Sequence, residues 1–186
     1  DVSGKGLRAA MIGAMMTGAL KASLALLSTE EALQACNRLL CRESQGSFFV
    51  TCALLEFTAG RQGVRLLNAG HLYPLLFQKQ SQRFTFVPNA RPQLPLAVEP
   101  ESRYEPVHVS MKEGNLLVFY SDGILEARNR AGDLFGFERL QKCIETYAYR
   151  PAKEICHEVV TEVASFSQSA VPEDDITLVV LRRTGP

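Results

Sequence analysis

Hydrophobic positions in the first quarter of the chain recur with helical spacing. Residues 7–27 are almost uncharged and predict a first helix. Ser28 or Thr29 can cap a second helix, because a side-chain hydroxyl accepts a hydrogen bond from a backbone N–H at the helix start. Glu30 and Glu31 would open that helix, since acidic residues are favourable in a first turn. Its apolar face is formed by Leu33, Cys36, Leu39 and Leu40.

Strand-like patterns follow in the middle of the chain. Residues 47–58 are apolar, aromatic and β-branched, and residues 64–78 continue this character after a turn at 60–63. The second run is interrupted at 68–70, and the two runs together predict an antiparallel hairpin. Further strands are predicted at 83–87, 104–110, 115–120 and 176–182, and helices at 137–144 and 152–165. Leading helices, mostly antiparallel strands and two late helices predict an α+β fold of layered sheets and helices.

The helix predicted at 7–27 carries a stripe of small side chains. The stripe consists of Ala10, Ala14, Gly18 and Ala22. Residues four positions apart share one helix face, so the stripe would let another element approach closely. A membrane span needs about 20 predominantly apolar residues, and this stretch is rich in Ala, Met, Gly and Thr rather than Leu, Ile and Val. We therefore favour a buried core helix over a membrane helix, and expect Ala14→Leu to destabilise the fold by overpacking.

Composition narrows the function classes. A chain of 186 residues with 46% hydrophobic and 22% charged residues is typical of one globular domain rather than a disordered chain or a coiled coil. Twenty Lys and Arg residues balance twenty Asp and Glu residues, so the formal net charge is zero. Nucleic-acid binding is disfavoured, because no basic field attracts a phosphate backbone.

The cysteines and the chain start indicate a compartment. Five cysteines at irregular spacing, with no CxxC pair, argue against a disulfide framework or a structural zinc site. A reducing cytoplasm is the simplest location, since free thiols persist there. No basic segment precedes an apolar stretch at the start, so we expect no signal peptide and no membrane insertion by this domain.

Acidic residues stand where predicted strands meet loops. Asp1 lies in DVSGKG, Asp122 directly follows the apolar run LLVFYS, and Asp174 and Asp175 precede ITLVV. Carboxylates at such positions are held by the strand and open to solvent, and oxygen ligands suit hard ions such as Mg²⁺ and Mn²⁺. Asp-Gly and Glu-Asp-Asp are also common turn signals, so the residues alone leave both interpretations open.

Seven segments of the chain resemble the PPM superfamily of metal-dependent serine/threonine phosphatases, and most of all its bacterial SpoIIE and RsbU branch. They are DVSGKG at 1–6, FFVTCALLEF at 48–57, NAGH at 68–71, LPLAV at 94–98, YSDGILEARN at 120–129, GDLFGFERL at 132–140 and DDITLVVLR at 174–182. Each motif is weak alone, but together they keep the family's order and cover essentially the whole chain. The resemblance implies an αββα sandwich of two antiparallel sheets flanked by helices, with a two-metal site at one edge of the sheets.

The resemblance also implies metal ligands. Asp1 would bridge two Mn²⁺ or Mg²⁺ ions, and the backbone carbonyl of Val2 would bind one of them. The carboxylates of Asp122 and Asp174 would hold the other ion, with Asp175 in support. The side chains of Asp1, Asp122 and Asp174 are therefore expected to face one cleft.

Four further residues are expected to support this site. Gly4 and Gly6 would let the loop turn sharply beside the ions, because glycine has no Cβ. Gly123 would permit a tight exit after Asp122. His71 in NAGH could act near the substrate or as a general acid, but we favour a structural hydrogen bond.

The implied reaction is hydrolysis of phosphoserine or phosphothreonine. Water bridging two divalent ions loses a proton near neutral pH and can attack phosphorus in line, so no protein nucleophile is needed. The ions would also neutralise charge on the phosphoryl oxygens. The implied substrate is a phosphorylated STAS-domain anti-anti-sigma factor. The alternative is a catalytically silent PPM-like module that binds such a partner without turnover.

Two departures from the family pattern stand out. Ala97 in LPLAV occupies a position where the family usually has glycine. The family's domain also has strands before DVSGKG, including one with a GGDxYD-like motif that supplies a further metal ligand. We therefore expect residues 1–186 to form a single phosphatase domain that lacks its first strands, with a sensor or receiver domain upstream in the parent protein.

Overall fold

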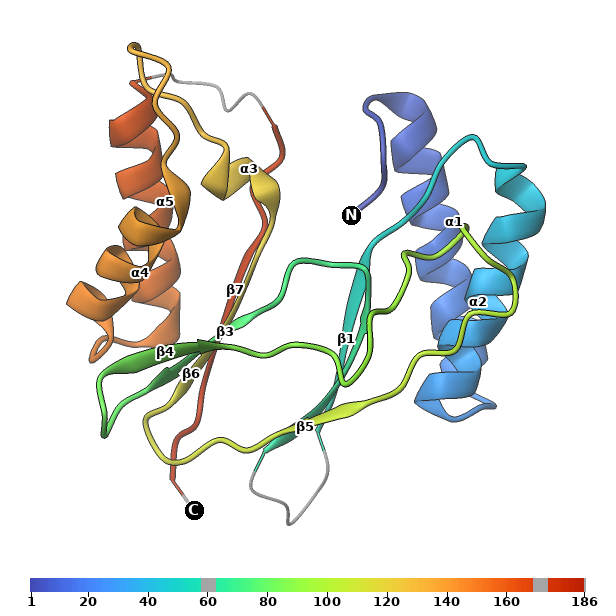
Figure 1. Ribbon diagram of the computed structural model, residues 1–186, viewed down its shortest axis with the longest axis horizontal. Helices are drawn as coiled ribbons and strands as arrows, with labels where there is room; N and C mark the ends of the chain where they lie inside the picture. The colour runs from blue at the N-terminus through green and yellow to red at the C-terminus, as the bar shows by residue number, and fades with distance from the viewer. Residues whose placement is uncertain (58–62, 169–173, 186) are drawn as a thin grey trace. The chain divides into compact units, whose positions relative to one another are not determined.

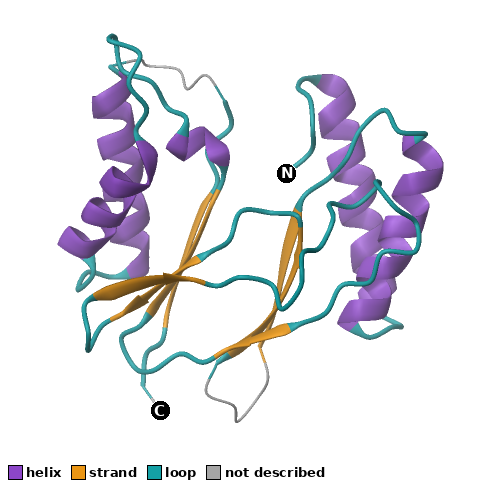
Figure 2. Cartoon of the chain, viewed as in Figure 1, coloured by secondary structure: helices purple, strands orange, loops and turns teal. Residues whose placement is uncertain are grey.

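Two compact units make up the chain. The computed structural model describes residues 1–57, 63–168 and 174–185. One unit comprises Asp1–His71 and Asn89–Ser110, and the other Leu72–Pro88 and Met111–Pro186. Each contains one antiparallel sheet with helices packed on it (Figures 1 and 2). The predicted class, α+β with two antiparallel sheets flanked by helices, is confirmed.

The first unit packs two helices on a three-stranded sheet. Its elements are α1 (Leu7–Leu24), α2 (Thr29–Ser44), β1 (Cys52–Phe57), β2 (Val64–Ala69) and β5 (Val107–Val109), with strand order β1-β2-β5. Both strand pairings are antiparallel, so the predicted pairing of the first two strands is confirmed. Ile12, Met16 and Leu33 of the helices share one core with Leu67 and Ala69 of β2. Burial of these side chains holds the helices on the sheet.

The second unit packs two longer helices and one short helix with a four-stranded sheet. Its elements are β3 (Leu75–Gln78), β4 (Arg83–Phe86), β6 (Leu116–Tyr120), α3 (Asp122–Leu125), α4 (Gly136–Tyr147), α5 (Ala152–Ser167) and β7 (Leu178–Arg182). The strand order is β4-β3-β6-β7, and every pairing is antiparallel. β6 is buried along its whole length, and its inward side chains share a core with Leu140 of α4 and Ile155 of α5.

One predicted strand is divided between the sheets. Residues 64–78 form β2 in the first unit and β3 in the second, and the interruption at 68–70 is where the chain leaves the first sheet. The Asn68 side chain accepts a hydrogen bond from the His71 N–H (2.8 Å) and donates one to the His71 carbonyl (3.0 Å). Gly70 has φ 67° and lies so close to Pro95 that a Cβ would be 2.6 Å from its ring. These local bonds replace a continued ladder, so the two strands belong to different sheets.

The small-residue stripe of α1 is not the face that packs. Ala10, Ala14, Gly18 and Ala22 are exposed, whereas Ile12 and Met16 are buried. The expectation that the stripe allows close packing is therefore wrong. Larger side chains bury more apolar surface, and they turn the helix so that its small side chains face outward. Among the residues that the structure describes, no helix is long and apolar enough to span a membrane.

This orientation reverses the expected effect of enlarging Ala14. Ala14→Leu is expected to change the free energy of unfolding by less than about 0.5 kcal/mol, because the new side chain extends into solvent. Ile12→Ala on the buried face is expected to cost about 2 to 5 kcal/mol. Urea denaturation of both variants measures the difference. A larger loss for the Ala14 variant would contradict this orientation of α1.

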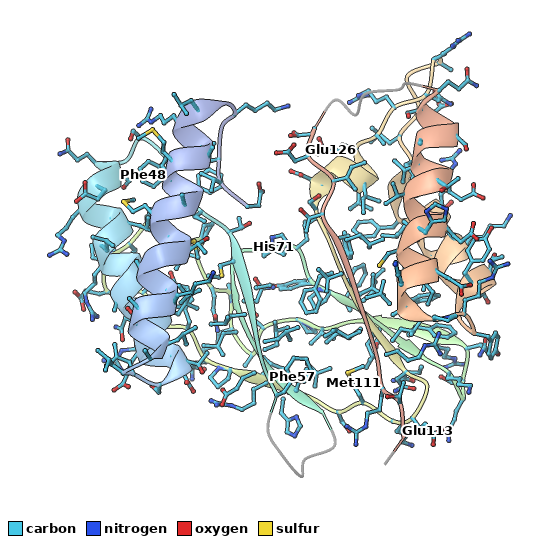
Figure 3. All side chains as sticks on the ribbon, turned by 180° about the vertical axis from the view of Figure 1, so that it is seen from behind. Phe48, Phe57, His71, Met111, Glu113 and Glu126 are labelled. Carbon is cyan, nitrogen blue, oxygen red and sulfur yellow. The ribbon has the colours of Figure 1, made fainter. Side chains whose placement is uncertain are left out.

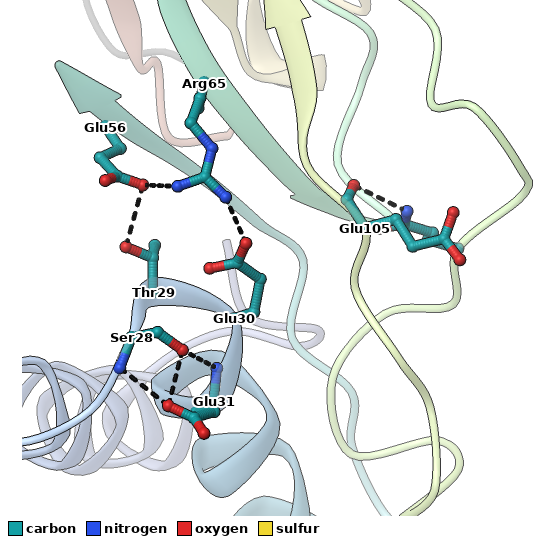
Figure 4. A network of polar contacts seen from close by, with 8 residues as sticks. Ser28, Thr29, Glu30, Glu31, Glu56, Arg65 and Glu105 are labelled. Atoms are coloured by element: carbon teal, nitrogen blue, oxygen red, sulfur yellow. Dashed lines mark hydrogen bonds and ion pairs between the residues drawn. The ribbon is translucent and has the colours of Figure 1, made fainter. Parts of the chain in front are cut away.

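A capping box begins α2. The Ser28 hydroxyl accepts a hydrogen bond from the Glu31 N–H (3.3 Å), and the Glu31 carboxylate accepts one from the Ser28 N–H (3.0 Å) (Figure 4). Arg65 of β2 binds Glu56 of β1 at 2.5 Å and also binds Glu30 in the first turn of α2. The helix start is thus fixed both locally and to the sheet.

Removing the Ser28 hydroxyl should weaken the start of α2. Ser28→Ala is expected to destabilise the fold by about 1 kcal/mol, since a backbone N–H of the first turn loses its acceptor. Ser28→Asp restores an acceptor and is expected to recover most of the loss. Thermal unfolding of the three proteins tests the cap. Equal midpoints for Ser28→Ala and the native chain would show that the cap contributes nothing.

Candidate active site

The pairing of β6 with β7 brings two acidic segments together. The strands are antiparallel, with Tyr120 at the end of β6 opposite Leu178 at the start of β7. Asp122 comes two residues after Tyr120, and Asp174 and Asp175 come shortly before Leu178. These segments, far apart in sequence, therefore meet at one edge of the sheet, where Figure 1 shows α3.

Ser121 fixes the two segments to each other. This buried residue donates its N–H to the Thr177 carbonyl (3.0 Å), and its hydroxyl accepts the Thr177 N–H (2.9 Å). The hydroxyl also donates to the Asp175 carbonyl at 3.0 Å. Because the Ser121 side chain forms two hydrogen bonds to residues 175–177, the backbone that carries Asp122 is held against the backbone that carries Asp175.

Gly123 allows this close approach. A Cβ at position 123 would lie 2.3 Å from the Asp175 carbonyl oxygen. That distance is far below van der Waals contact, so only glycine fits without movement of the backbone. Sequence reasoning expected a tight exit after Asp122, whereas the structure shows that glycine is needed for contact between the two segments.

The acidic side chains at this edge present oxygen atoms to solvent. Asp122, Asp174 and Asp175 are exposed, and the Asp174 carboxylate accepts the Asp175 N–H at 2.9 Å. Exposed carboxylates on a rigid strand end suit a hard divalent cation, so these residues fit Mg²⁺ or Mn²⁺. Within the described ranges, no three His, Cys, Asp or Glu side chains gather into a metal-holding group. The described carboxylates of this edge therefore do not by themselves form such a group.

Glu126 is a further acidic residue that sequence reasoning did not select. Its N–H donates to the Asp122 carbonyl at 2.8 Å, so the helical geometry of α3 extends to it. Figure 3 labels Glu126. Residues four apart on a helix lie on the same face, so the exposed Glu126 carboxylate projects on the side of Asp122. The spacing of Asp122 and Glu126 in SDGILE was the signal that could have revealed it.

Asp1 and Val2 lie in the first unit, in a short antiparallel ladder. The Asp1 nitrogen donates to the Thr51 carbonyl (2.9 Å), and the Thr51 N–H donates to the Asp1 carbonyl (2.8 Å). Val2 pairs with Val50, and the Ser3 N–H donates to the Phe49 carbonyl at 3.0 Å. Residues 1–3 thus form an edge beside the segment that leads into β1.

The loop after this ladder contains two glycines in the left-handed region. Gly4 has φ 92° and Gly6 has φ 79°, and neither would place a Cβ within 4 Å of another residue. Backbone conformation rather than lack of space therefore requires glycine at both positions. The loop turns sharply into α1, which begins at Leu7.

His71 is tied to the same segment as Asp1. Its Nδ1 is hydrogen-bonded to the Thr51 hydroxyl at 2.9 Å, and its backbone is held by Asn68. Figure 3 labels His71. The site residues thus fall into two groups. Asp1, Val2 and His71 belong to the first unit, and the acidic edge belongs to the second. Convergence of Asp1 on Asp122 and Asp174 stays a prediction.

The cysteines offer no activated nucleophile. All five are free, and burial raises the pKa of every thiol, to about 11 for Cys52 and Cys143. Cys36 and Arg42 have the CxxxxxR spacing of cysteine-dependent phosphatases, but both lie within α2. A continuous helix cannot form the phosphate-cradling loop that this chemistry requires.

Comparison with known proteins identifies the family. The sequence matches the family described as Stage II sporulation protein E (SpoIIE) over residues 1–184. The chain belongs to the SpoIIE family. Phosphoserine phosphatase RsbU of Bacillus subtilis (strain 168) is 27% identical over an alignment of 186 positions, which covers 98% of this chain and 54% of that protein. This SpoIIE-family chain therefore spans about half the length of that relative.

Solved structures share the fold of this SpoIIE-family chain. The RsbU and RsbW domains of a Mycobacterium tuberculosis protein match with a TM-score of 0.81 and 24% identity, over 100% of this chain and 51% of that one. The PP2C phosphatase domain of SpoIIE from Bacillus subtilis, with a fragment of its regulatory domain, matches with a TM-score of 0.77 and 22% identity. That match covers 96% of this chain and 51% of the other. The resemblance to the SpoIIE and RsbU branch is confirmed.

Ala97 shows the effect of one departure from the family pattern. It adopts φ 69°, a left-handed conformation that favours glycine, and it is buried in the core of the first unit. Its N–H donates to the Asn37 side chain at 2.9 Å, which holds the loop in place. The alanine therefore holds a left-handed conformation at a cost in backbone strain of about 1 to 2 kcal/mol.

Proposed function

We propose that this chain is the catalytic domain of a metal-dependent protein phosphatase that hydrolyses phosphoserine or phosphothreonine. The observation that carries the proposal is the acidic edge, where Asp122 and Asp174 are brought together by the pairing of β6 and β7. Membership of the SpoIIE family and similarity to a phosphoserine phosphatase support the same chemistry.

The proposed metal ligands are Asp122 and Asp174 in the second unit and Asp1 with the Val2 carbonyl in the first. All of them offer oxygen atoms, which suits Mn²⁺ or Mg²⁺. Two such ions, when bound, would supply a water of lowered pKa and would neutralise charge on the phosphoryl group. Asp175 would act through its N–H, which holds the Asp174 carboxylate at 2.9 Å.

The remaining residues of the site would keep these carboxylates in place. Ser121 ties the end of β6 to the segment before β7, so Asp122 cannot move independently of Asp175. Gly123 keeps the two backbones in contact, and Gly4 and Gly6 shape the loop after Asp1. Positioning and electrostatic stabilisation together supply most of the acceleration in phosphoryl transfer, because little covalent chemistry is required of the protein.

The proposed substrate is a phosphorylated STAS-domain anti-anti-sigma factor in bacterial signalling. The support is the resemblance to the RsbU branch and the similarity to a structure that contains RsbU and RsbW domains. A sensor or receiver domain would control the activity within the parent protein. The acidic edge is exposed, so a phosphorylated side chain on the surface of a partner protein could reach it.

Phosphate release tests the proposed function. The protein that contains this chain is incubated with a phosphoserine-bearing STAS domain in Mn²⁺, in Mg²⁺ and in chelator. We expect release with a metal and none in chelator, since the proposed nucleophile is a metal-bound water and the five cysteines are not activated. Full activity in chelator would rule out the metal-dependent mechanism. Tight binding of the STAS domain without release under any metal would establish the interaction module instead.

A further inference from the structure

Asp1 and Thr51 are directly opposite each other in an antiparallel ladder. They exchange both backbone hydrogen bonds, at 2.9 Å and 2.8 Å. Opposite residues project their side chains to the same face, with Cβ atoms about 4.5 to 5.5 Å apart. The Thr51 hydroxyl and the Asp1 carboxylate are therefore cross-strand neighbours.

The Thr51 side chain is itself held by His71. The hydroxyl and the imidazole Nδ1 are 2.9 Å apart, and either can donate, depending on which ring nitrogen carries the proton. Threonine is β-branched and has a stiff χ1 angle, so one hydrogen bond is enough to select its rotamer. His71 therefore determines where the Thr51 hydroxyl stands next to Asp1.

The backbone of His71 lies in a segment, residues 68–71, that several contacts hold in place. The fully buried Asn68 bonds both the N–H and the carbonyl of His71, and Asn89 donates to the Asn68 carbonyl at 3.0 Å. Gly70, which lies between Asn68 and His71 in the sequence, packs tightly against Pro95. Asn68, Asn89 and Gly70 thus fix the backbone from which His71 reaches Thr51.

We propose that Thr51 and His71 are positioning residues for Asp1, and that His71 acts through its Nδ1 rather than as a general acid. The bond from His71 fixes the Thr51 hydroxyl, which in turn limits the positions open to the Asp1 carboxylate. This inference rests on the proposed function, in which Asp1 binds the metal ions. Removing a residue that hydrogen-bonds or orients a metal ligand typically lowers metal affinity or activity by about 10- to 100-fold.

Two pairs of variants separate this role from general packing. Thr51→Val keeps the shape and removes the hydroxyl, whereas Thr51→Ser keeps the hydroxyl. His71→Asn places an amide near the position of Nδ1, whereas His71→Gln places it near the position of Nε2. Thr85→Val on the exposed strand β4 and His108→Asn on β5 are matched controls.

Three readouts are measured on the protein that contains this chain: Mn²⁺ affinity by calorimetry, phosphate release, and the melting temperature without metal. We expect Thr51→Val and His71→Gln to lose about 10- to 100-fold in Mn²⁺ affinity. Thr51→Ser and His71→Asn should stay within about 3-fold of the native protein, since each preserves the bond. Both controls should match the native protein. A merely structural role would lower the melting temperature and leave the affinity of the folded protein unchanged.

An NMR measurement tests the bond independently of activity. In protein labelled with ¹⁵N-histidine, Thr51→Val should shift the His71 Nδ1 resonance, and Thr85→Val should not. The inference is overturned if that resonance does not move, if Thr51→Val binds Mn²⁺ normally, or if His71→Gln is tolerated and His71→Asn is not. If the native protein binds Mn²⁺ but releases no phosphate, the proposed function fails, while the affinity and NMR results still decide the role of Thr51 and His71.

Discussion

Replacing Asp122 with asparagine is expected to lower metal-dependent phosphate release by on the order of 100- to 1000-fold, the range for removing one group that stabilises transition-state charge. An amide is neutral and is a poorer ligand for a hard cation than a carboxylate. Asp174→Asn should have a similar effect, because β6 and β7 hold the two residues at one edge. Both side chains are exposed, so the fold should survive either change.

Glu113→Gln provides the matched control for these variants. Glu113, which Figure 3 labels, is also an exposed carboxylate. It precedes β6, whereas Asp122 follows that strand. Phosphate release and Mn²⁺ affinity should be unchanged in this variant. Phosphate release and calorimetric titration with Mn²⁺ are measured for all three proteins. Native activity in either asparagine variant would remove that residue from the proposed ligand set.

The second large effect is expected at Gly123. Gly123→Ala should destabilise the fold by about 1 to 3 kcal/mol, since the added Cβ would lie 2.3 Å from the Asp175 carbonyl oxygen. Relief of that clash requires the segments that carry Asp122 and Asp174 to move apart. Mn²⁺ affinity should therefore fall as well, even at temperatures where the variant is fully folded.

Gly18→Ala provides the opposite case. Gly18 lies within α1 with no other residue near the position of an added Cβ, so alanine should stabilise the chain by about 0.5 to 1 kcal/mol. Urea denaturation of both variants, with Mn²⁺ titration of the folded proteins, measures the two effects. If Gly123→Ala is as stable as the native chain and binds Mn²⁺ equally well, the close approach of the two backbones at the acidic edge contributes neither to stability nor to metal binding.

Sequence reasoning succeeded where local patterns decide the structure. The helix predicted at 152–165 is α5 at Ala152–Ser167, because its apolar spacing matches the core that it covers. A cap at Ser28 or Thr29 was also predicted, and the structure places it at Ser28, where the hydroxyl and Glu31 satisfy the first turn together. Both features depend on residues within a few positions of each other.

Features that depend on distant partners could not be predicted. No local sequence pattern indicates that β7 pairs with β6, so the proximity of Asp174 to Asp122 was expected only from the family resemblance. The need for glycine at 123 arises from the Asp175 backbone, which is remote in sequence. For α1, the small stripe was chosen as the packing face because spacing alone does not show which side of an almost uncharged helix meets the sheet.

The division of residues 64–78 between two sheets makes the registers of β2 and β3 independent. A slip of β2 by one residue against β1 would turn Leu67 and Ala69 away from the helices, because side chains alternate along a strand. The same slip would leave the pairing of β3 with β6 intact, since those strands belong to the other sheet. During folding, an error in strand alignment would therefore stay confined to one sheet and could be corrected there without unpairing the other.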